Sequence, residues 1–351
     1  MPVVRNQRLA LRIAAALFGT ALAVGLLEVG LRVAGLAPPL PEEYGNNVRD
    51  DAIAFRKRPG STYRGPSESG EFTIELAHNS LGFRDSEHPL AKPADTIRIV
   101  ALGNSFTYGV GADFAATYLA QVERRLNERP GHHRRVEIIK LGLPRHFPLL
   151  ERLTLEHYGL PFAPDIVLVT SLPNDVINTQ QGLTSICAAE AGYLVPCAAL
   201  GWGEAAVWLY LRSAVARLAL RGWSHYLHPT VDGALWSSLF ADNGPYESAW
   251  LSLEGELERM QRAAHTHGAV FVVVAAPQGP PWRDLHAYQE TRLQRWSAAH
   301  GAFFIPTLAA LRAAPPSPPL YWERDGHCTP AGYAVIADAI VAALVADGLT
   351  P

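Results

Sequence analysis

The sequence predicts an α/β fold, a parallel sheet with helices on both faces, preceded by a helix that crosses a membrane. From residue 96 onward, short apolar segments alternate with amphipathic ones, which indicates strands alternating with helices. The strands, such as "TIRIVAL" and "AVFVVVAAP", are apolar along their whole length, which is typical of parallel sheets buried on both faces. An uncharged apolar run near the N-terminus indicates the membrane helix.

The composition limits the classes of protein to which the chain can belong. With 351 residues, 48% of them hydrophobic and 18% charged, the chain can bury a full α/β core and one accessory element, and general disorder is excluded. A net charge of -3 without a long basic stripe indicates no nucleic-acid partner. No spacing indicates a metal site, and no cofactor is expected. Cys187 and Cys197 could form a disulfide in an oxidising compartment, and two buried thiols are the alternative.

The N-terminal segment, residues 1–37, is predicted to be an uncleaved signal anchor. Its apolar run from Ile13 to Leu27 is followed by Glu28, near the far membrane interface, and by Arg32, which can snorkel. Basic residues before the run place the following domain outside the cytoplasm, which predicts a single-pass protein of the cell inner membrane with a periplasmic main domain. These basic residues are Arg5, Arg8 and Arg12.

Two other interpretations of this segment remain. A cleaved signal peptide would give a secreted protein, and Val33 and Gly35 loosely satisfy the requirement for small residues at the cleavage site. A buried helix of a soluble protein agrees less well with the sequence, because the basic flank has the polarity of a signal.

The rest of the chain divides into a lead-in, a main domain and an insertion. Residues 38–95 are rich in proline, glycine and charge, and the alternating run "EFTIELAHN" predicts one or two edge strands there. The α/β domain comprises residues 96–176 and 247–351. Residues 177–246 are too many for a connection and predict a helical insertion or lid. Its apolar residues Trp208, Leu211 and Leu218 are expected to pack inside the protein, in preference to membrane contact.

The elements of the α/β domain follow one another regularly. The expected strands are "TIRIVAL", "RVEIIKLG", "PDIVLVTS", "AVFVVVAAP" and "AFFIP". The expected helices lie around residues 115–127, in "PLLERLTLEHYG", in "ESAWLSLEGELERMQRAAHTHG", in "WRDLHAYQETRLQRWSAAHG" and in "TPAGYAVIADAIVAALVADG". The last helix has Thr329 as its N-cap, Pro330 at its first position and Gly348 as its stop.

Three short polar segments lie where such a sheet places its chemistry, beyond the carboxyl ends of its strands. Ser105, in "LGNSFTYG", follows the first strand and is either a nucleophile or the cap of the next helix. Asn174, in "PNDV", follows the third strand and can donate its amide to an oxyanion, or form a local turn with Asp175. In "DGHCTPAGY", Asp325 and His327 are two residues apart, so an extended backbone directs both to one side.

Each segment alone has an ordinary structural explanation, but together they fill every role of nucleophilic catalysis. A histidine can take the proton of a serine hydroxyl, and a carboxylate can hold the histidine in the required tautomer. The segments resemble those of the SGNH (GDSL-type) hydrolase superfamily over residues 96–346, and "LLEVGLR", "FRKRPGS" and "NSLGFRD" are similar to membrane-anchored bacterial members. The resemblance implies a flavodoxin-like three-layer α/β/α sandwich and metal-independent transfer or hydrolysis of acyl esters. It implies Ser105 as nucleophile, His327 as base, Asp325 as its partner, and Asn174 as oxyanion donor.

The chain departs from the family pattern at three places. Asn104 stands where the family has aspartate before the nucleophile, and Asp-x-His replaces the more familiar Asp-x-x-His. In "KLGLPRHFP", Arg145 occupies the place of a glycine whose backbone N–H binds the oxyanion, and Gly142 matches an earlier glycine. The resemblance therefore offers two backbone N–H groups, that of Ser105 and that of either Arg145 or Gly142, beside the Asn174 amide.

These observations predict a membrane-tethered, extracytoplasmic serine esterase that acts on O-acyl groups of envelope glycans or lipids. The first alternative is an O-acyltransferase that uses the same residues with a sugar hydroxyl as acceptor, which a water-excluding lid over the site would favour. The second alternative is a glycan-binding or assembly protein on a degenerate hydrolase fold, which Arg145 keeps open.

Overall fold

The computed structural model of the chain describes most of its length. The described residues are 2–37, 46–67, 69–130, 134–183, 187–188, 192–195, 203–227, 243–279 and 286–350.

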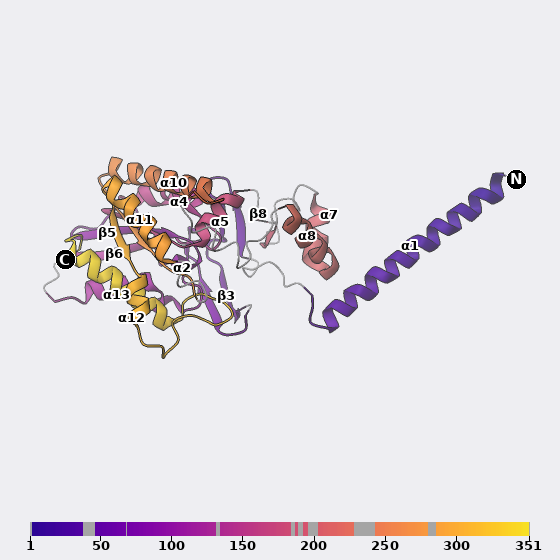
Figure 1. The fold of residues 1–351 in the computed structure, drawn as a ribbon, viewed down its shortest axis with the longest axis horizontal. Coiled ribbons are helices and arrows are strands. Elements are labelled where there is room, and N and C mark those ends of the chain that lie inside the picture. The colour runs from indigo at the N-terminus through magenta and orange to yellow at the C-terminus, as the bar shows by residue number, and fades with distance from the viewer. Residues whose placement is uncertain are drawn as a thin grey trace.

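A parallel sheet forms the centre of the globular part of the molecule, at the left of Figure 1. Within the described residues it has five strands in the order β11-β10-β7-β5-β6, and every neighbouring pair is parallel. Numbered along the chain, this is the flavodoxin-like order 2-1-3-4-5, with its switch point between β5 and β7. The strands are β5 (Thr96–Gly103), β6 (Arg135–Lys140), β7 (Ile166–Ser171), β10 (Val270–Ala275) and β11 (Phe303–Pro306).

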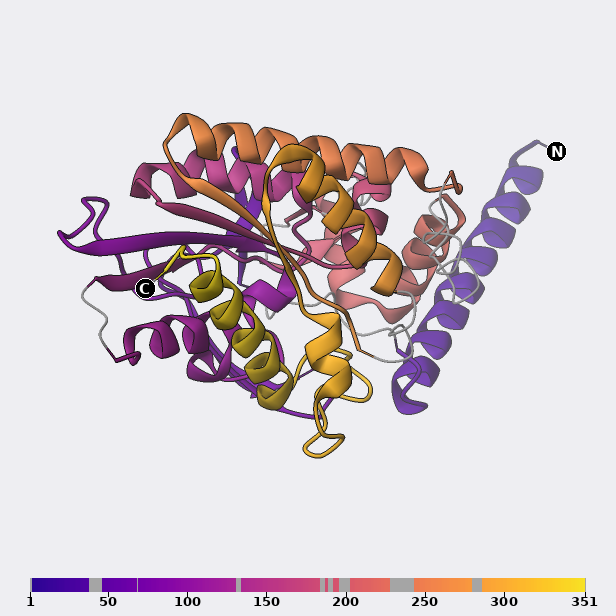
Figure 2. The same cartoon turned by 60° about the vertical axis from the view of Figure 1, so that its left-hand side comes forward.

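Helices cover both faces of the sheet, because strands without a polar face need apolar cover on each side (Figure 2). On β5, Ile97 and Ile99 belong to one apolar cluster, which includes side chains of α3 (Tyr118–Asn127), α12 (Leu308–Ala313) and α13 (Pro330–Ala346). Val100 and Leu102 belong to the opposite cluster. That cluster is completed by α4 (Pro148–Thr154) with its continuation to Gly159, α10 (Glu247–Thr266) and α11 (His286–His300). The predicted three-layer α/β/α sandwich is confirmed.

The ends of the last helix agree with its sequence signals. Thr329 is the N-cap of α13, and its hydroxyl accepts a hydrogen bond from the N–H of Gly332. Pro330 occupies the first helical position, and Gly348, just after the helix, has a φ of +66°.

The lead-in forms two hairpins outside the central sheet. One consists of β1 (Asn47–Asp50) and β2 (Ala54–Lys57), and the other of β3 (Thr62–Pro66) and β4 (Thr73–Ala77). The segment "EFTIELAHN" contains the strand β4, and within the described residues each hairpin pairs only with itself and not with a strand of the α/β domain. The alternation in "EFTIELAHN" arises because Ile74 and Leu76 are buried in a small cluster of their own with Tyr108.

The insertion follows α5 (Asn174–Gln181), which crosses the predicted boundary at residue 177. Its helical pattern forms two helices, α7 (Glu204–Arg212) and α8 (Ala214–Leu227), separated by Ser213 in an extended conformation. Between α5 and α7 lies a short ladder of β8 (Cys187–Ala188) and β9 (Leu194–Val195). Cys187 is disulfide-bonded, and Cys197 lies outside the described residues.

The expected packing of the insertion holds only in part. Leu211 packs in a small cluster with Tyr210 and Leu220, whereas Trp208 and Leu218 are 54% and 50% exposed. The two residues therefore do not contribute to a core of the insertion.

The N-terminal helix α1 (Pro2–Val33) extends away from the sandwich (Figure 1). Its segment Leu11–Val33 is long and apolar enough to cross a membrane, a property that signal sequences near the N-terminus share. No part of the apolar window is buried against the rest of the described chain. In both views, α7 and α8 lie between the sandwich and α1 (Figures 1 and 2).

Candidate active site

Ser105 lies at the end of β5 and is the first residue of the short helix α2 (Ser105–Tyr108). The cap of that helix is Asn104, whose Oδ1 accepts a hydrogen bond from the N–H of Phe106 at 3.2 Å. The turn requires Gly103, because its φ is +151° and a Cβ there would lie 2.1 Å from the Thr107 hydroxyl oxygen. Since Asn104 performs the capping, the Ser105 hydroxyl is left for another partner.

That partner is His327. The distance from His327 Nε2 to Ser105 Oγ is 2.8 Å, and the distance from His327 Nδ1 to Asp325 Oδ1 is 2.5 Å. Both side chains remain partly accessible, with 22% of His327 and 16% of Asp325 exposed. The structure therefore brings the three residues together in the order hydroxyl, imidazole, carboxylate, which allows the imidazole to take the hydroxyl proton while the carboxylate stabilises the resulting cation.

The hydrogen bonds from His327 also affect the carboxylate. Burial opposes ionisation of Asp325, but the hydrogen bond and charge of His327 outweigh it, so the pKa of Asp325 is lowered from its ordinary value. Asp325 is consequently an anion at neutral pH, as is required to hold Nδ1 as the protonated nitrogen of the ring.

The loop that carries Asp325 is held by the β3–β4 hairpin. The Glu71 carboxylate, in the turn of this hairpin, accepts hydrogen bonds from the backbone N–H groups of Arg324 at 3.1 Å and Asp325 at 2.9 Å. Beside it, Phe72 stacks on Trp322, with 5.0 Å between ring centroids. The lead-in thus fixes the backbone of the residue that orients His327.

The lead-in also supports the end of α2. The buried Arg84, from the "NSLGFRD" segment, donates to the carbonyl oxygens of Gly109 at 2.7 Å and Ala112 at 2.9 Å. Its neighbour Asp85 accepts from the N–H of Lys140 at the end of β6, at 2.8 Å. Arg84, which also donates to the carbonyl oxygen of Tyr108 at 3.3 Å, therefore binds the last carbonyl group of the short helix and those of the loop that follows it.

Asn174 is the first residue of α5, after β7, and a buried network joins it to the Ser105 loop. Asn104 Nδ2 donates to Asn174 Oδ1 at 3.2 Å and to Asp175 Oδ1 at 2.9 Å. Because Asn174 accepts through its oxygen, its Nδ2 group is directed elsewhere as a donor. Asp175 Oδ2 accepts from the N–H of Leu172 at 2.8 Å, which closes the turn after β7.

This network explains the asparagine at position 104. An aspartate there would place a second carboxylate next to Asp175, whereas the asparagine offers an acceptor to Phe106 and a donor to Asp175 at once. The departure from the family pattern is thus compensated by its hydrogen-bond partners.

A second buried carboxyl group lies near this network. Glu151, on α4, is 1% exposed, and among the described residues neither of its carboxyl oxygens has a hydrogen-bond partner. Burial, and to a smaller extent the charge of Asp175, raises the pKa of Glu151 well above its ordinary value. Burial also raises the pKa of Asp175. We conclude that Glu151 holds its proton in the folded protein.

Gly142 and Arg145 occupy different positions on the loop after β6. A Cβ on Gly142 would lie 2.5 Å from the backbone nitrogen of Tyr108, so the loop packs directly on α2 at this residue. Arg145 is exposed and has a φ of +66°, a backbone conformation that glycine adopts most easily. This agrees with its alignment to a glycine of the family, and its exposed side chain does not pack into the core.

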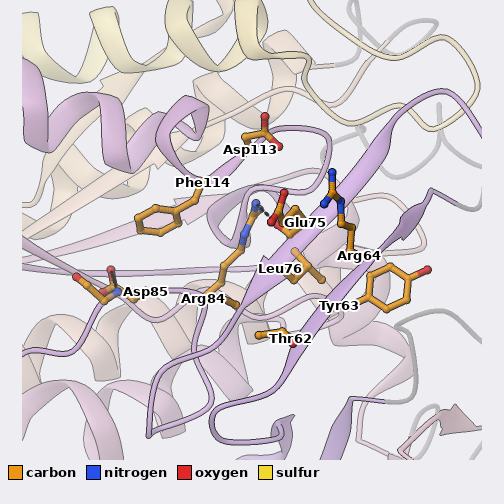
Figure 3. Close-up of a pocket in the computed structure, with 11 residues that line it drawn as sticks. Thr62, Tyr63, Arg64, Glu75, Leu76, Arg84, Asp85, Asp113 and Phe114 are labelled. Carbon is orange, nitrogen blue, oxygen red and sulfur yellow. Dashed lines mark hydrogen bonds between the residues drawn. The ribbon is translucent and has the colours of Figure 1, made fainter.

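A cavity of 740 Å³ is lined in part by Arg84 and Asp85 of the lead-in (Figure 3). Figure 3 shows Arg84 between Tyr63 on one side and Phe114 on the other. Among the described residues that line it, none is Ser105, Asp325 or His327. In the described part of the chain, no group of three His, Cys, Asp or Glu side chains is arranged to hold a metal ion.

Comparison with known proteins identifies the family. Residues 101–335 match the GDSL-like lipase/acylhydrolase family, and the chain belongs to it. The family assignment confirms the expected SGNH (GDSL-type) hydrolase and makes the protein an ester hydrolase. No curated protein matches the chain significantly.

Solved structures are similar at low identity. A lipase/acylhydrolase from Enterococcus faecalis is 15% identical, with 73% of this chain and 97% of that chain covered and a TM-score of 0.43. A lipase from a goat rumen metagenome is 14% identical, with coverages of 70% and 97% and a TM-score of 0.45. A catalytic mutant of an acetylxylan esterase from Geobacillus stearothermophilus is 14% identical, with coverages of 71% and 94% and a TM-score of 0.43.

Sequence reasoning missed Glu71, Arg84 and Glu151. Glu71 and Arg84 act on backbone groups far away in the chain, so no local pattern reveals them. Glu151 had a detectable signal, because it follows the apolar residues "PLL" in the first turn of its helix. A glutamate in a first turn is usually exposed, however, and only the structure shows that this one is buried.

Replacing Glu71 is expected to impair catalysis without unfolding the protein. Glu71→Ala removes the acceptor for two backbone N–H groups of the Asp325 loop, so we expect kcat for a soluble ester to fall about ten- to hundredfold, as displacement of a catalytic group by about 1 Å does. The matched control is Glu75→Ala, an exposed glutamate of β4 in the same hairpin. Equal activities of the two variants would show that the hairpin does not position the loop.

Replacing Glu151 by an apolar residue is expected to stabilise the protein. The folded state retains a proton on Glu151 that the unfolded chain releases above its ordinary pKa, so the cost of burying this group grows as the pH rises from that value toward the raised one. Glu151→Met should therefore raise the free energy of unfolding by about 1–3 kcal/mol near neutral pH, and by less near about pH 4.

Urea unfolding at both pH values measures this difference. Glu128→Met, at the exposed end of α3, is the control and should stay within about 0.5 kcal/mol of the wild type. An advantage of Glu151→Met that is equal at both pH values would contradict a proton held on Glu151.

Proposed function

We propose that the protein is an extracytoplasmic, membrane-tethered serine esterase with Ser105 as nucleophile, His327 as general base and Asp325 as its orienting carboxylate. The observation that carries this proposal is the pair of contacts at His327, 2.8 Å to Ser105 Oγ and 2.5 Å to Asp325 Oδ1. Such a contact lets the base accept the hydroxyl proton as the oxygen attacks an acyl carbonyl. The family's ester hydrolysis supports the same assignment.

In the proposed reaction, Ser105 Oγ forms a bond to the acyl carbon and His327 Nε2 receives the hydroxyl proton. The carbonyl oxygen becomes an oxyanion, which Asn174 Nδ2 and the backbone N–H of Ser105 stabilise. The alcohol leaves with the proton from His327. Water then attacks the acyl-enzyme, loses a proton to His327, and releases the carboxylic acid and the free serine.

We place a third oxyanion donor at the backbone N–H of Arg145, with Gly142 as the alternative. The glycine-like φ of Arg145 supports this choice, and so does the exposure of its side chain, which leaves room for substrate. Gly142 packs on the backbone of α2, so its lack of a side chain is already explained by that contact.

The proposed location rests on the N-terminal helix and on Cys187. Leu11–Val33 can cross a membrane, and basic residues precede it, which favours a domain outside the cytoplasm. The disulfide at Cys187 fits an oxidising compartment such as the periplasm. In that compartment the available acyl esters are those of envelope glycans and lipids, which we propose as substrates.

Ser105→Ala tests the proposal. In the full-length protein purified in detergent, we expect hydrolysis of a short-chain aryl ester to fall at least about a thousandfold, because the covalent route is lost. Wild type should also become labelled on Ser105 by a fluorophosphonate. Ser252→Ala, an exposed serine on α10, is the control and should retain both properties.

The outcomes separate the possible functions. Wild-type protein that neither hydrolyses the ester nor takes the label would contradict the esterase and favour a non-catalytic binding protein. Turnover that increases when sugar alcohols are added, with an acylated sugar as product, would indicate an acyltransferase.

A further inference from the structure

The C-terminal part of α1 contacts the insertion through Glu28. Its carboxylate accepts hydrogen bonds from the backbone N–H groups of Ala214 at 2.9 Å and Val215 at 3.0 Å, and from the hydroxyl of Ser213 at 2.9 Å. Ala214 and Val215 are the first residues of α8, whose N–H groups have no partner within the helix. A side chain of the candidate membrane helix therefore caps a helix of the insertion.

One turn later, Arg32 makes a second contact. Its guanidinium donates to the carbonyl oxygen of Arg212, the last residue of α7, at 2.6 Å, and to Glu28 at 2.7 Å. Glu28 and Arg32 together thus bind the start of α8 and the end of α7. The turn between α7 and α8 is therefore fixed to α1 at the level of Glu28 and Arg32 along the axis of α1.

The level of Glu28 on α1 corresponds to the edge of a membrane. The uncharged run Ile13 to Leu27 has a length of roughly 22 Å as a helix, against a hydrocarbon core of about 30 Å. Because the run is shorter than the core, the bilayer must thin around α1 or the flanking charged side chains must snorkel, and either adjustment brings Glu28 to a boundary of the core. Since Glu28 binds the first turn of α8, that turn lies at the same boundary.

The surface of α7 and α8 is suited to this position. Trp208, Leu209 and Leu218 are 54%, 47% and 50% exposed, and the Arg212 guanidinium lies 4.9 Å from the centre of the Trp208 ring. We call these four residues the interfacial patch. Tryptophan and arginine are characteristic of the headgroup region, where an apolar body meets a polar environment.

We propose that α7 and α8 dock on the surface of the membrane that α1 crosses, with the interfacial patch in the headgroup region. The occupant of the patch is the lipid bilayer, because the patch continues directly from a helix that spans it. This inference rests on the proposed function only in that α1 is retained as an anchor. It goes beyond tethering, because it assigns the insertion a binding surface of its own.

Docking of the insertion orients the candidate active site. The insertion follows α5, whose first residue is Asn174, so it grows from the edge of the sheet that carries Ser105. The figures show α7 and α8 between the sandwich and α1 (Figures 1 and 2). The site is therefore held close to the membrane surface, which favours acyl esters that are carried by lipids over esters that are free in solution.

Spin labelling of the full-length chain in lipid vesicles tests the docking directly. Leu218→Cys and Leu251→Cys each carry a nitroxide, and the second is the matched control, because Leu251 is 58% exposed on α10 of the sandwich. Cys328 is buried and Cys187 is disulfide-bonded, and labelling of the unsubstituted chain gives the background. Accessibility to oxygen and to an aqueous nickel complex is then measured for each nitroxide.

The expected result is a markedly higher ratio of oxygen accessibility to nickel-complex accessibility at residue 218 than at the water-exposed residue 251. Equal access of the nickel complex to both positions would overturn the docking. Mass spectrometry of the same samples establishes that α1 is retained. The readout does not depend on esterase activity, so a failure of the proposed catalysis is recognised separately.

A second measurement tests the consequence for substrates. Trp208→Glu combined with Leu218→Glu should lower hydrolysis of a fluorogenic phospholipid ester in vesicles about tenfold, because charged residues do not enter the interface. Hydrolysis of a soluble aryl ester should not change. Leu251→Glu is the control and should leave both rates unchanged. A double variant that hydrolyses the phospholipid ester as fast as Leu251→Glu does would contradict the proposed orientation.

Discussion

The buried hydrogen bond from Asn104 to Asp175, 2.9 Å long, is the contact on which the geometry of the site depends. It joins the loops that follow β5 and β7, the two strands on either side of the switch point of the sheet. Each partner has a second task, because Asn104 caps the helix that begins with Ser105, and Asp175 closes the turn before Asn174. One buried pair therefore sets the positions of the candidate nucleophile and of the candidate oxyanion donor relative to each other.

The third part of the site reaches this pair from the other end of the chain. Asp325 and His327 precede α13; Glu71 binds the backbone of their loop, and the next residue, Cys328, is buried. The hairpin that carries Glu71 belongs to the lead-in, which the sequence presents as a connection between the anchor and the α/β domain. Its contacts show that the lead-in is part of the framework of the site, since Glu71 accepts hydrogen bonds from the backbone of Asp325 and of the residue before it.

The sequence predicted those features that have a local signal. The strands are marked by continuous apolar runs, and Ser105, Asn174 and His327 each stand at a strand end or before a capped helix, where parallel sheets place reactive groups. Features that depend on distant partners could not be predicted. Asn104, and not Ser105, caps α2. The Asn104 side chain is oriented for this by its hydrogen bond to Asp175, a residue far away in the sequence. Likewise, a period-two pattern in "EFTIELAHN" indicates a strand but does not say which strand it pairs with, so the separate hairpins were not foreseen.

The proposed membrane docking gives one explanation for two otherwise separate features, a carboxylate within an apolar helix and an insertion with exposed tryptophan and leucine. A charge at Glu28 is unfavourable in hydrocarbon but acceptable at its boundary, provided that polar groups replace water around it. The first N–H groups of α8 are such groups, and they in turn need an acceptor. Because α1 is joined to the rest of the protein both through the chain and through this contact, rotation of the sandwich about the anchor is restricted. In the proposed arrangement, an anchor attached in this way would determine the orientation of the candidate active site as well as its distance from the membrane.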